Sequence, residues 1–373
     1  MKALFVANVH LESNEGIYKK IIAEATALGN VIGECSLVLG EANSQNSRVY
    51  DVISGIEKKN EGSILSTAIK LIEQDRYSHL YIRLMIPNFK LIKLMKNAKK
   101  RNTKVFYEIP TYPFYAEQIR TSRKKHRAVV KVTLDAIFSP LVYKYCDIMP
   151  VIRSNSHIKL KKKMIEITNG VNTDTLKEKT YPSKNDGIFR MVTVGTLYPY
   201  HGYDRVLQGL MECNEEINGT PIEFHVVGHS QTIDDLEEKA NSLGLRRVFF
   251  HGTKTTEELN EMYESFDVGL GCLALHRRNA DIDTTLKVIE YYCRGVPVVT
   301  SGKSPYFDPQ VTITVPDNEA PININEIFEQ WKAVPSESIH LLSKKAKEVF
   351  DWNNVFAILF KKIIKETNNE VEK

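Results

Sequence analysis

The feature that most constrains the fold is an alternation, from end to end, of short apolar runs with longer amphipathic segments. In the first half, strand-like runs are expected at 2–9, 31–39, 79–84, 104–109, 147–152 and 164–168. Segments of helical period lie between them at 16–28, 63–74 and 89–101. Strands that alternate with helices of this length form βαβ units, so the sequence predicts a parallel sheet.

The same pattern starts again after a polar stretch rich in turn residues at 168–187. Residues 189–195 form an apolar run ending in glycine, and later runs end at Gly228, Gly252 and Gly271. A helix is expected at 284–294, and 336–366 is expected to be helical. A chain of 373 residues is long enough for two domains. We therefore expect Rossmann-like domains at 1–180 and 181–351, and a C-terminal helix at 352–373 that returns toward the first domain.

Glycines at strand ends suggest where a ligand binds. In open parallel sheets, ligands bind beyond the carboxyl ends of the strands, where a turn without a Cβ can approach a phosphate. The sequence contains neither GxGxxG nor GxxxxGK[ST]. A dehydrogenase or a P-loop enzyme is therefore disfavoured, and a nucleotide site of another kind remains possible.

Composition and charge narrow the class of protein further. The five cysteines are scattered without CxxC spacing, which is typical of reduced cytosolic thiols and makes a structural zinc site improbable. No apolar run is long enough for a spanning helix, and the first residues do not resemble a signal peptide, so a cytoplasmic location is expected. Residues 1–180 carry 30 Lys and Arg against 17 Asp and Glu, whereas residues 181–373 carry 20 against 29. This asymmetry predicts different partners for the two halves.

The strongest basic stretch of the first half spans 119–131 and contains no acidic residue. A solvated face is the simplest interpretation. The functional interpretation is adsorption to an anionic membrane, because such a surface attracts basic residues. Nucleic acid would attract the same charge, but no nucleic-acid-binding module is visible, so we expect no nucleic acid partner. The membrane-facing residues would be Arg120, Arg123, Lys124, Lys125, Arg127 and Lys131.

Five motifs in order resemble those of family 4 retaining glycosyltransferases, which have two facing Rossmann-like domains in the GT-B arrangement. They are IEITNGVNTDTL, VGTLYPYHGYDRVLQGL, HVVGH, VFFHG and TLKVIEYYCRGVPVVTSG, between residues 165 and 302. The resemblance implies a nucleotide-sugar donor bound by the second domain, an acceptor bound by the first, retention of anomeric configuration and no required metal or other cofactor. It suggests hexose transfer to a saccharide or lipid-linked saccharide, as in capsule or surface polysaccharide synthesis at the inner face of the cell membrane.

The resemblance also implies donor-binding residues. Glu290 would bind the ribose hydroxyls, and Lys287, with Thr285 and Leu286 at the start of the same helix, would meet the diphosphate. Two cations usual in the family are replaced here by Thr196 and His201, so Arg205 is expected to share the phosphate charge. The remaining donor-binding candidates are the glycines of the two strand ends, Gly195 and Gly228.

The acceptor and catalytic candidates lie in the first half. Asn8, His10 and Gly16 follow the first strand, and a proline-flanked turn contains Thr111 and Tyr112. A front-face retaining mechanism needs few protein groups, because the donor phosphate can take the acceptor proton. If a protein group takes part, Glu108 and Thr111 are the catalytic candidates.

Two rival functions remain open. A nucleotide-sugar epimerase on the same double fold would need acid and base groups that converge on one site, and the sequence does not identify them. A non-catalytic basic protein that binds membrane or nucleic acid is the rival from another class. Turnover of nucleotide sugars would separate the three.

Overall fold

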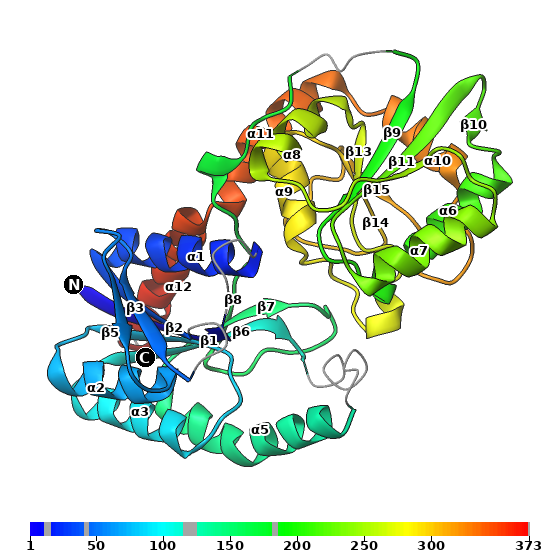
Figure 1. The fold of residues 1–373 in the computed structure, drawn as a ribbon. Coiled ribbons are helices and arrows are strands. Elements are labelled where there is room, and N and C mark those ends of the chain that lie inside the picture. The colour runs from blue at the N-terminus through cyan, green and yellow to red at the C-terminus, as the bar shows by residue number, and fades with distance from the viewer. Residues whose placement is uncertain (11–15, 41–44, 115–124, 181–185, 372–373) are drawn as a thin grey trace. The chain divides into compact units, whose positions relative to one another are not determined.

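The computed structural model describes residues 1–10, 16–40, 45–114, 125–180 and 186–371. The chain forms two compact units (Figure 1). The first unit contains Met1–Arg153, His157–Asn172 and Asp351–Lys373, and the second contains Ser154–Ser156 and Thr173–Phe350.

The first unit is built on an eight-stranded sheet of order β4-β3-β2-β1-β5-β6-β7-β8. The neighbouring strands β2, β1, β5, β6, β7 and β8 are parallel to one another. At one edge, β3 and β4 form a hairpin in which β3 is antiparallel to both β2 and β4. The strand bounds are β1 Lys2–His10, β2 Glu34–Gly40, β3 Ser47–Asp51, β4 Glu57–Asn60, β5 His79–Arg83, β6 Lys104–Tyr112, β7 Met149–Arg153 and β8 Met164–Glu166.

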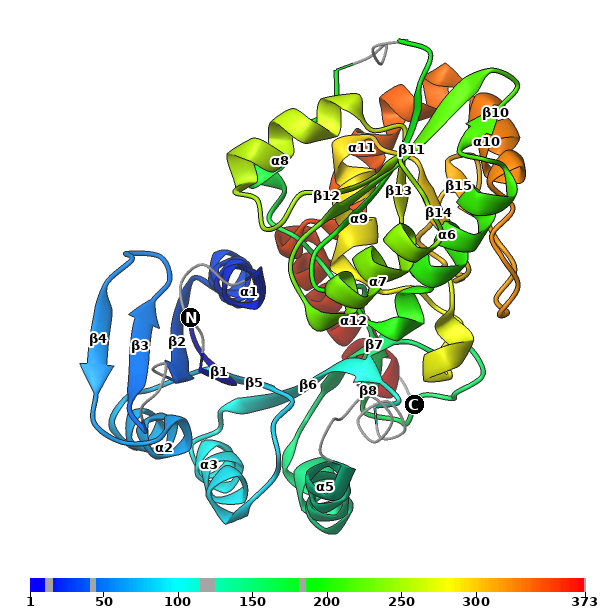
Figure 2. The ribbon, with the colours of Figure 1, turned by 45° about the vertical axis from the view of Figure 1, so that its right-hand side comes forward.

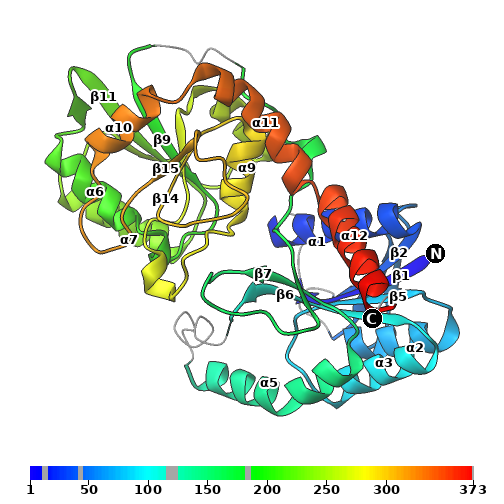
Figure 3. The ribbon, with the colours of Figure 1, turned by 180° about the vertical axis from the view of Figure 1, so that it is seen from behind.

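Helices cover both faces of this sheet. Figure 2 shows α2 (Ile64–Gln74), α3 (Phe89–Lys100) and α5 (Lys125–Tyr145) on one face. The other face is covered by α1 (Gly16–Ile32) and α12 (Trp352–Val371), which pack against each other (Figure 3). Each face has its own buried apolar cluster, with Leu91 and Leu94 in one and Trp352 and Phe356 in the other. Asn88 caps α3 by accepting hydrogen bonds from the backbone of Lys90 and Leu91.

The second unit has a seven-stranded sheet of order β10-β11-β9-β13-β14-β15, with β12 paired to β11. All pairs are parallel except β10 with β11. The strand bounds are β9 Phe189–Val194, β10 Glu216–Ile217, β11 Thr220–Val227, β12 Val248–Phe250, β13 Val268–Leu270, β14 Val298–Thr300 and β15 Thr312–Thr314.

Six α-helices of the second unit lie on the two faces of its sheet (Figures 1 and 2). They are α6 Tyr203–Glu212, α7 Gln231–Ser242, α8 Thr256–Met262, α9 Leu286–Arg294, α10 Ile324–Lys332 and α11 Ser336–Phe350. The short 3₁₀ turns are η1 Thr173–Thr175, η2 Pro199–His201, η3 Tyr263–Ser265 and η4 Leu275–Arg278. Helix α9 ends at Gly295, whose left-handed backbone (φ +80°) closes the helix.

The α/β class and the two Rossmann-like sheets confirm the fold expected from the sequence. Two details differ. The hairpin β3–β4 was not expected, and β2 begins at Glu34 because α1 continues to Ile32. The helical stretch at 336–366 is two helices, since Asp351 pairs with Val171 and accepts a hydrogen bond from the backbone of Asn353, which starts a new helix.

Candidate active site

Two glycine turns shape the carboxyl ends of β9 and β11. Gly195 and Gly228 have φ values of +108° and +139°. A Cβ on Gly228 would lie 2.3 Å from the carbonyl oxygen of Gly195, so only glycine allows the two turns to pack backbone to backbone. Gly195 and the next residue, Thr196, are exposed, which leaves this strand end open to a ligand.

His201 closes the short turn η2 that follows. It is 2% exposed, and its Nδ1 accepts a hydrogen bond from the backbone N–H of Tyr198 at 3.0 Å. Burial, followed by the nearby cations Lys287 and Arg278, holds the pKa of His201 well below its ordinary value. The ring is therefore neutral, with its proton on Nε2, and its evident role is to cap the turn.

A buried hydroxyl network joins the ends of β9 and β13 to α9. Lys287 donates from Nζ to the hydroxyls of Tyr203 at 3.2 Å and Thr193 at 3.3 Å. The Tyr203 hydroxyl donates in turn to the carbonyls of Leu270 and Gly271, at 2.8 and 2.9 Å. Within the described part of the chain, Lys287 forms no ion pair. Burial lowers its pKa to about 8, against the opposing influence of the nearby Asp283 carboxylate, so near neutral pH Lys287 is a cation that hydrogen-bonds only to neutral hydroxyls.

Asp283 fixes the start of α9 beside this lysine. Its Oδ1 accepts hydrogen bonds from the backbone and hydroxyl of Thr285, at 3.1 and 2.7 Å. Its Oδ2 accepts from the backbone of Cys272 at 2.7 Å and the hydroxyl of Thr300 at 3.0 Å. This carboxylate thus holds the first turn of α9 against β13 and β14. The free N–H groups of that turn, beginning at Leu286, form an anion-binding end.

Glu290 lies on α9, three residues after Lys287, and its side chain is partly exposed. Side chains three residues apart on a helix face the same side. The structure therefore places together Thr285, Leu286, Lys287 and Glu290, which the sequence had selected as a donor-binding set.

Arg205 is placed differently from the expectation. It is 1% exposed, and its guanidinium donates to the carbonyls of Ala320 and Leu273 and to two groups of the 316–318 loop. Four hydrogen bonds to uncharged oxygens hold this side chain inside the unit. The geometry favours a structural role, in which Arg205 fastens the loop before α10, over the phosphate contact expected from the sequence.

The catalytic candidate Glu108 is also inside a core. It is fully buried on β6, in a cluster with Glu24 of α1, Arg83 of β5 and Lys20. Arg83 donates to Glu24 at 3.1 Å. Burial, then the neighbouring Glu108, raises the pKa of Glu24 well above its ordinary value, so this cluster shares a proton. A group without exposed surface cannot contact an acceptor, which argues against Glu108 as a base.

The other candidates of the first unit lie at its strand ends. Asn8 is exposed and lines a hollow of about 420 Å³ together with Ser63, Asn88 and Lys90. His10 ends β1 and Gly16 begins α1. Thr111 is partly exposed and donates to the carbonyl of Pro110 at 2.8 Å, and Tyr112 is partly exposed as well. The structure thus places Asn8 in this hollow, whereas Tyr112 lines a separate cavity of about 430 Å³ beside α5.

The basic stretch is only partly covered by the structure. Arg120, Arg123 and Lys124 lie outside the described residues. Lys125 and Arg127 belong to the first turn of α5, and Lys131 is exposed on the same helix. No helix among the described residues is both long and apolar enough to cross a membrane.

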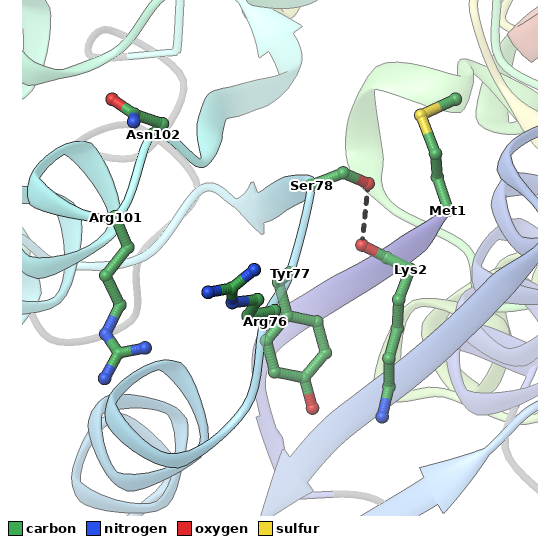
Figure 4. Close-up of a pocket in the computed structure, with 7 residues that line it drawn as sticks. All are labelled: Met1, Lys2, Arg76, Tyr77, Ser78, Arg101 and Asn102. Carbon is green, nitrogen blue, oxygen red and sulfur yellow. Dashed lines mark hydrogen bonds between the residues drawn. The ribbon is translucent and has the colours of Figure 1, made fainter.

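A second hollow, of about 580 Å³, opens at the amino ends of β1 and β5 (Figure 4). It is lined by Lys2, Arg76, Tyr77 and Arg101, and the Ser78 hydroxyl donates to the carbonyl of Lys2 at 2.9 Å. This is the edge opposite to the one at which open parallel sheets bind their ligands, so we do not place substrate there.

Residues 189–323 match the model of the family described as "Glycosyl transferases group 1". No curated protein matches the sequence. Among solved structures, the chain is similar to sucrose-phosphate synthase from Thermosynechococcus elongatus, with 13% identity, 99% of each chain covered and a TM-score of 0.63. It is also similar to the lipopolysaccharide outer core galactosyltransferase WaaB, with 13% identity, 97% of this chain and 100% of that chain covered, and a TM-score of 0.60.

A third similar structure is the catalytic domain of starch synthase IV from Arabidopsis thaliana, with 10% identity, 98% of each chain covered and a TM-score of 0.58. At such identities the likeness concerns the fold, which is the GT-B fold expected from the sequence. The family match falls on the unit that contains Lys287 and Glu290.

Proposed function

Because the second unit carries a group 1 glycosyltransferase domain, we propose that this protein is a retaining, metal-independent glycosyltransferase. It moves a hexose from a nucleotide-diphosphate sugar to a saccharide or lipid-linked saccharide in surface polysaccharide synthesis. The observation that carries the proposal is Lys287, a buried cation whose hydrogen-bond partners are both neutral hydroxyls, at the ligand-binding edge of that domain.

The second unit binds the donor. Lys287 and the N–H groups at the start of α9 receive the diphosphate, whose negative charge supplies the direct ion pair that Lys287 lacks. Glu290 accepts hydrogen bonds from the ribose hydroxyls. The Gly195 and Gly228 turns, with Thr196, allow the donor to approach the backbone closely.

Transfer proceeds on one face of the donor sugar. The donor phosphate oxygen that leaves the anomeric carbon takes the proton of the attacking acceptor hydroxyl, so no protein base is required. Lys287 stabilises the charge that develops on the diphosphate. The buried position of Glu108 is compatible with this chemistry.

The first unit receives the acceptor, with Asn8 and its hollow as the saccharide-facing part. Basic residues of 119–131, to which the exposed Lys131 belongs, hold this unit to the inner face of the cell membrane. Co-sedimentation with phosphatidylglycerol vesicles tests this location. Binding should weaken between 0.1 M and 1 M salt, where the Debye length falls from about 10 Å to about 3 Å. Binding that ignores salt would contradict it, and full competition by duplex DNA would favour a general polyanion-binding protein.

The activity itself is tested with a panel of UDP, GDP and ADP sugars, in which release of the nucleoside diphosphate is measured with and without EDTA. Activity that EDTA leaves intact is expected, together with an α- or β-linked product of the donor's own configuration. An epimerised sugar without transfer would identify the epimerase instead. Absence of turnover and of binding across the whole panel would leave the non-catalytic binding protein.

A further inference from the structure

A cavity in the first unit is separate from the hollow at Asn8. It occupies about 430 Å³ between α5 and the face of the sheet, which is within the usual range of about 300–1,000 Å³ for small-molecule sites. Tyr107 and Ile109 of β6 form one wall, and Val142 of α5, Met149 and Met164 form others. The greater part of the lining is apolar, which suits an apolar ligand.

The rim of this cavity is basic. Lys161, which lines it, is exposed, and its ammonium makes no ion pair with any residue that the structure describes. Lys159 is exposed on the same loop. One acidic residue, Asp135, also lines the cavity and is buried. A ligand with an anionic group would therefore keep that group at Lys161 and its apolar part inside.

The helix that roofs the cavity is apolar on its outer side as well. Val130, Leu134, Ile137 and Leu141 recur at helical spacing on α5, and Val130 and Ile137 are 57% and 62% exposed. Phe89, the first residue of the neighbouring α3, is 82% exposed and touches Phe138. An exposed apolar stripe of this kind marks an interaction surface, and with the lysines of α3 beside it the surface suits the interface of an anionic bilayer.

We propose that this cavity holds the aliphatic chain of the lipid carrier to which the acceptor saccharide is attached, with the carrier's phosphate at Lys161. The inference rests on the proposed function, because it names the lipid part of the acceptor. It follows from the combination of a largely apolar cavity, a cation without an ion pair at its rim, and an apolar outer helix face that would lie against the bilayer.

Displacement of the fluorescent fatty acid cis-parinaric acid by farnesyl phosphate, below its critical micelle concentration, tests the proposal. Ser139→Phe places a ring in the cavity, and Ala136→Phe places the same ring on the exposed side of α5. We expect at least tenfold weaker farnesyl phosphate binding in Ser139→Phe and less than a twofold change in Ala136→Phe. Equal affinities in the two variants would overturn the proposal.

A rim variant keeps the test decisive if Ser139→Phe does not fold. Lys161→Glu should weaken farnesyl phosphate at least fivefold and leave farnesol unchanged, whereas Lys93→Glu on α3 should change neither. Equal weakening of both ligands in Lys161→Glu would overturn the placement of the phosphate. Displacement by inorganic phosphate alone, or equally by dihexanoyl phosphatidylglycerol, would overturn the assignment to a lipid carrier.

Donor turnover separates this inference from the proposed function. Hydrolysis of the nucleotide sugar should be unchanged in Ser139→Phe and Lys161→Glu. A wild-type protein that binds farnesyl phosphate but turns over no donor would refute the glycosyltransferase. A wild-type protein that turns over donor but does not bind farnesyl phosphate would refute the cavity assignment alone.

Discussion

Nζ of Lys287 lies 3.2 Å from the hydroxyl oxygen of Tyr203, and the same tyrosine hydroxyl donates to the carbonyls that end β13. The tyrosine thus holds the lysine at the edge of the sheet without neutralising it. A buried cation without a direct ion pair is costly, and a bound diphosphate would supply one.

This relationship predicts a pH dependence of donor binding. Protonated Lys287 attracts the diphosphate, and burial lowers its pKa to about 8, so the binding-competent fraction falls as pH rises through 8. The apparent Kd for the nucleoside diphosphate should be about tenfold weaker at pH 9 than at pH 7. Isothermal titration calorimetry at several pH values measures it. In Lys287→Met, binding should be weak at every pH, and its Kd should not change between pH 7 and pH 9. A wild-type Kd that does not change over this range would exclude Lys287 from the diphosphate site.

Arg205→Met should lower stability and spare donor binding. The substitution removes four hydrogen bonds from a buried guanidinium and leaves carbonyls such as those of Ala320 and Leu273 without their donor. We expect a loss of about 2–4 kcal/mol in the free energy of unfolding. Urea denaturation followed by circular dichroism measures it, with the exposed Arg246→Met as control. A donor Kd weakened more than tenfold at unchanged stability would restore the phosphate role expected from the sequence.

Periodicity alone predicted the two parallel sheets, because long helices and buried strands carry strong patterns. The hairpin β3–β4 escaped prediction, since Glu57, Lys58 and Lys59 put exposed charges on a strand that has no apolar alternation. Charged edge strands of this kind prevent pairing with other chains, so their sequence is atypical of strands by necessity.

The proximity of Thr285, Leu286, Lys287 and Glu290 was predictable, because these residues lie within six positions of one another at the start of one helix. The structural role of Arg205 was not predictable. Its hydrogen-bond partners lie far along the chain, at 273 and 316–320, and only the tertiary fold brings them to its guanidinium. The burial of Glu108 could not be predicted for a related reason. Strand β6 is buried on both faces, so alternation along the sequence gives no sign of which side chains reach solvent.

Asp283→Ala should loosen the start of α9. The substitution leaves the buried backbone N–H of Cys272 and the groups of Thr285 without their acceptor. We expect about 2–4 kcal/mol of lost stability and weaker nucleoside diphosphate binding, because the anion-binding turn loses its anchor. Thermal unfolding and calorimetry measure the two effects, and Asp235→Ala on the exposed side of α7 is the control. Full stability in Asp283→Ala would show that the hydrogen bonds of this carboxylate do not hold the turn.

Glu108→Gln should leave catalysis nearly unchanged. The side chain is fully buried beside Glu24 and Arg83, so it does not meet the acceptor. We expect kcat/KM for transfer within about threefold of the wild type, as for a residue outside the reacting groups. Initial rates at saturating donor, with the melting temperature measured in parallel, provide the test. A loss of a hundredfold or more in a fully folded variant would make Glu108 the catalytic base after all.

Glu290→Ala should weaken the donor and leave the fold intact. Its side chain is partly exposed on the face of α9 that also carries Lys287, so its removal deletes hydrogen bonds to the ribose without opening a core. The loss of a charged hydrogen-bond acceptor should cost about 1.5–3 kcal/mol, which is roughly 10- to 150-fold in donor affinity or kcat/KM. Glu257→Ala, which removes an exposed carboxylate from α8 of the same unit, should change neither.

Comparison of nucleoside diphosphate with inorganic pyrophosphate separates the ribose contact from the diphosphate contact. The Glu290→Ala variant should lose affinity for the nucleoside diphosphate and keep it for pyrophosphate, because pyrophosphate has no ribose. Equal losses for both ligands would move Glu290 from the ribose to the diphosphate, and unchanged binding of both would remove it from the donor site.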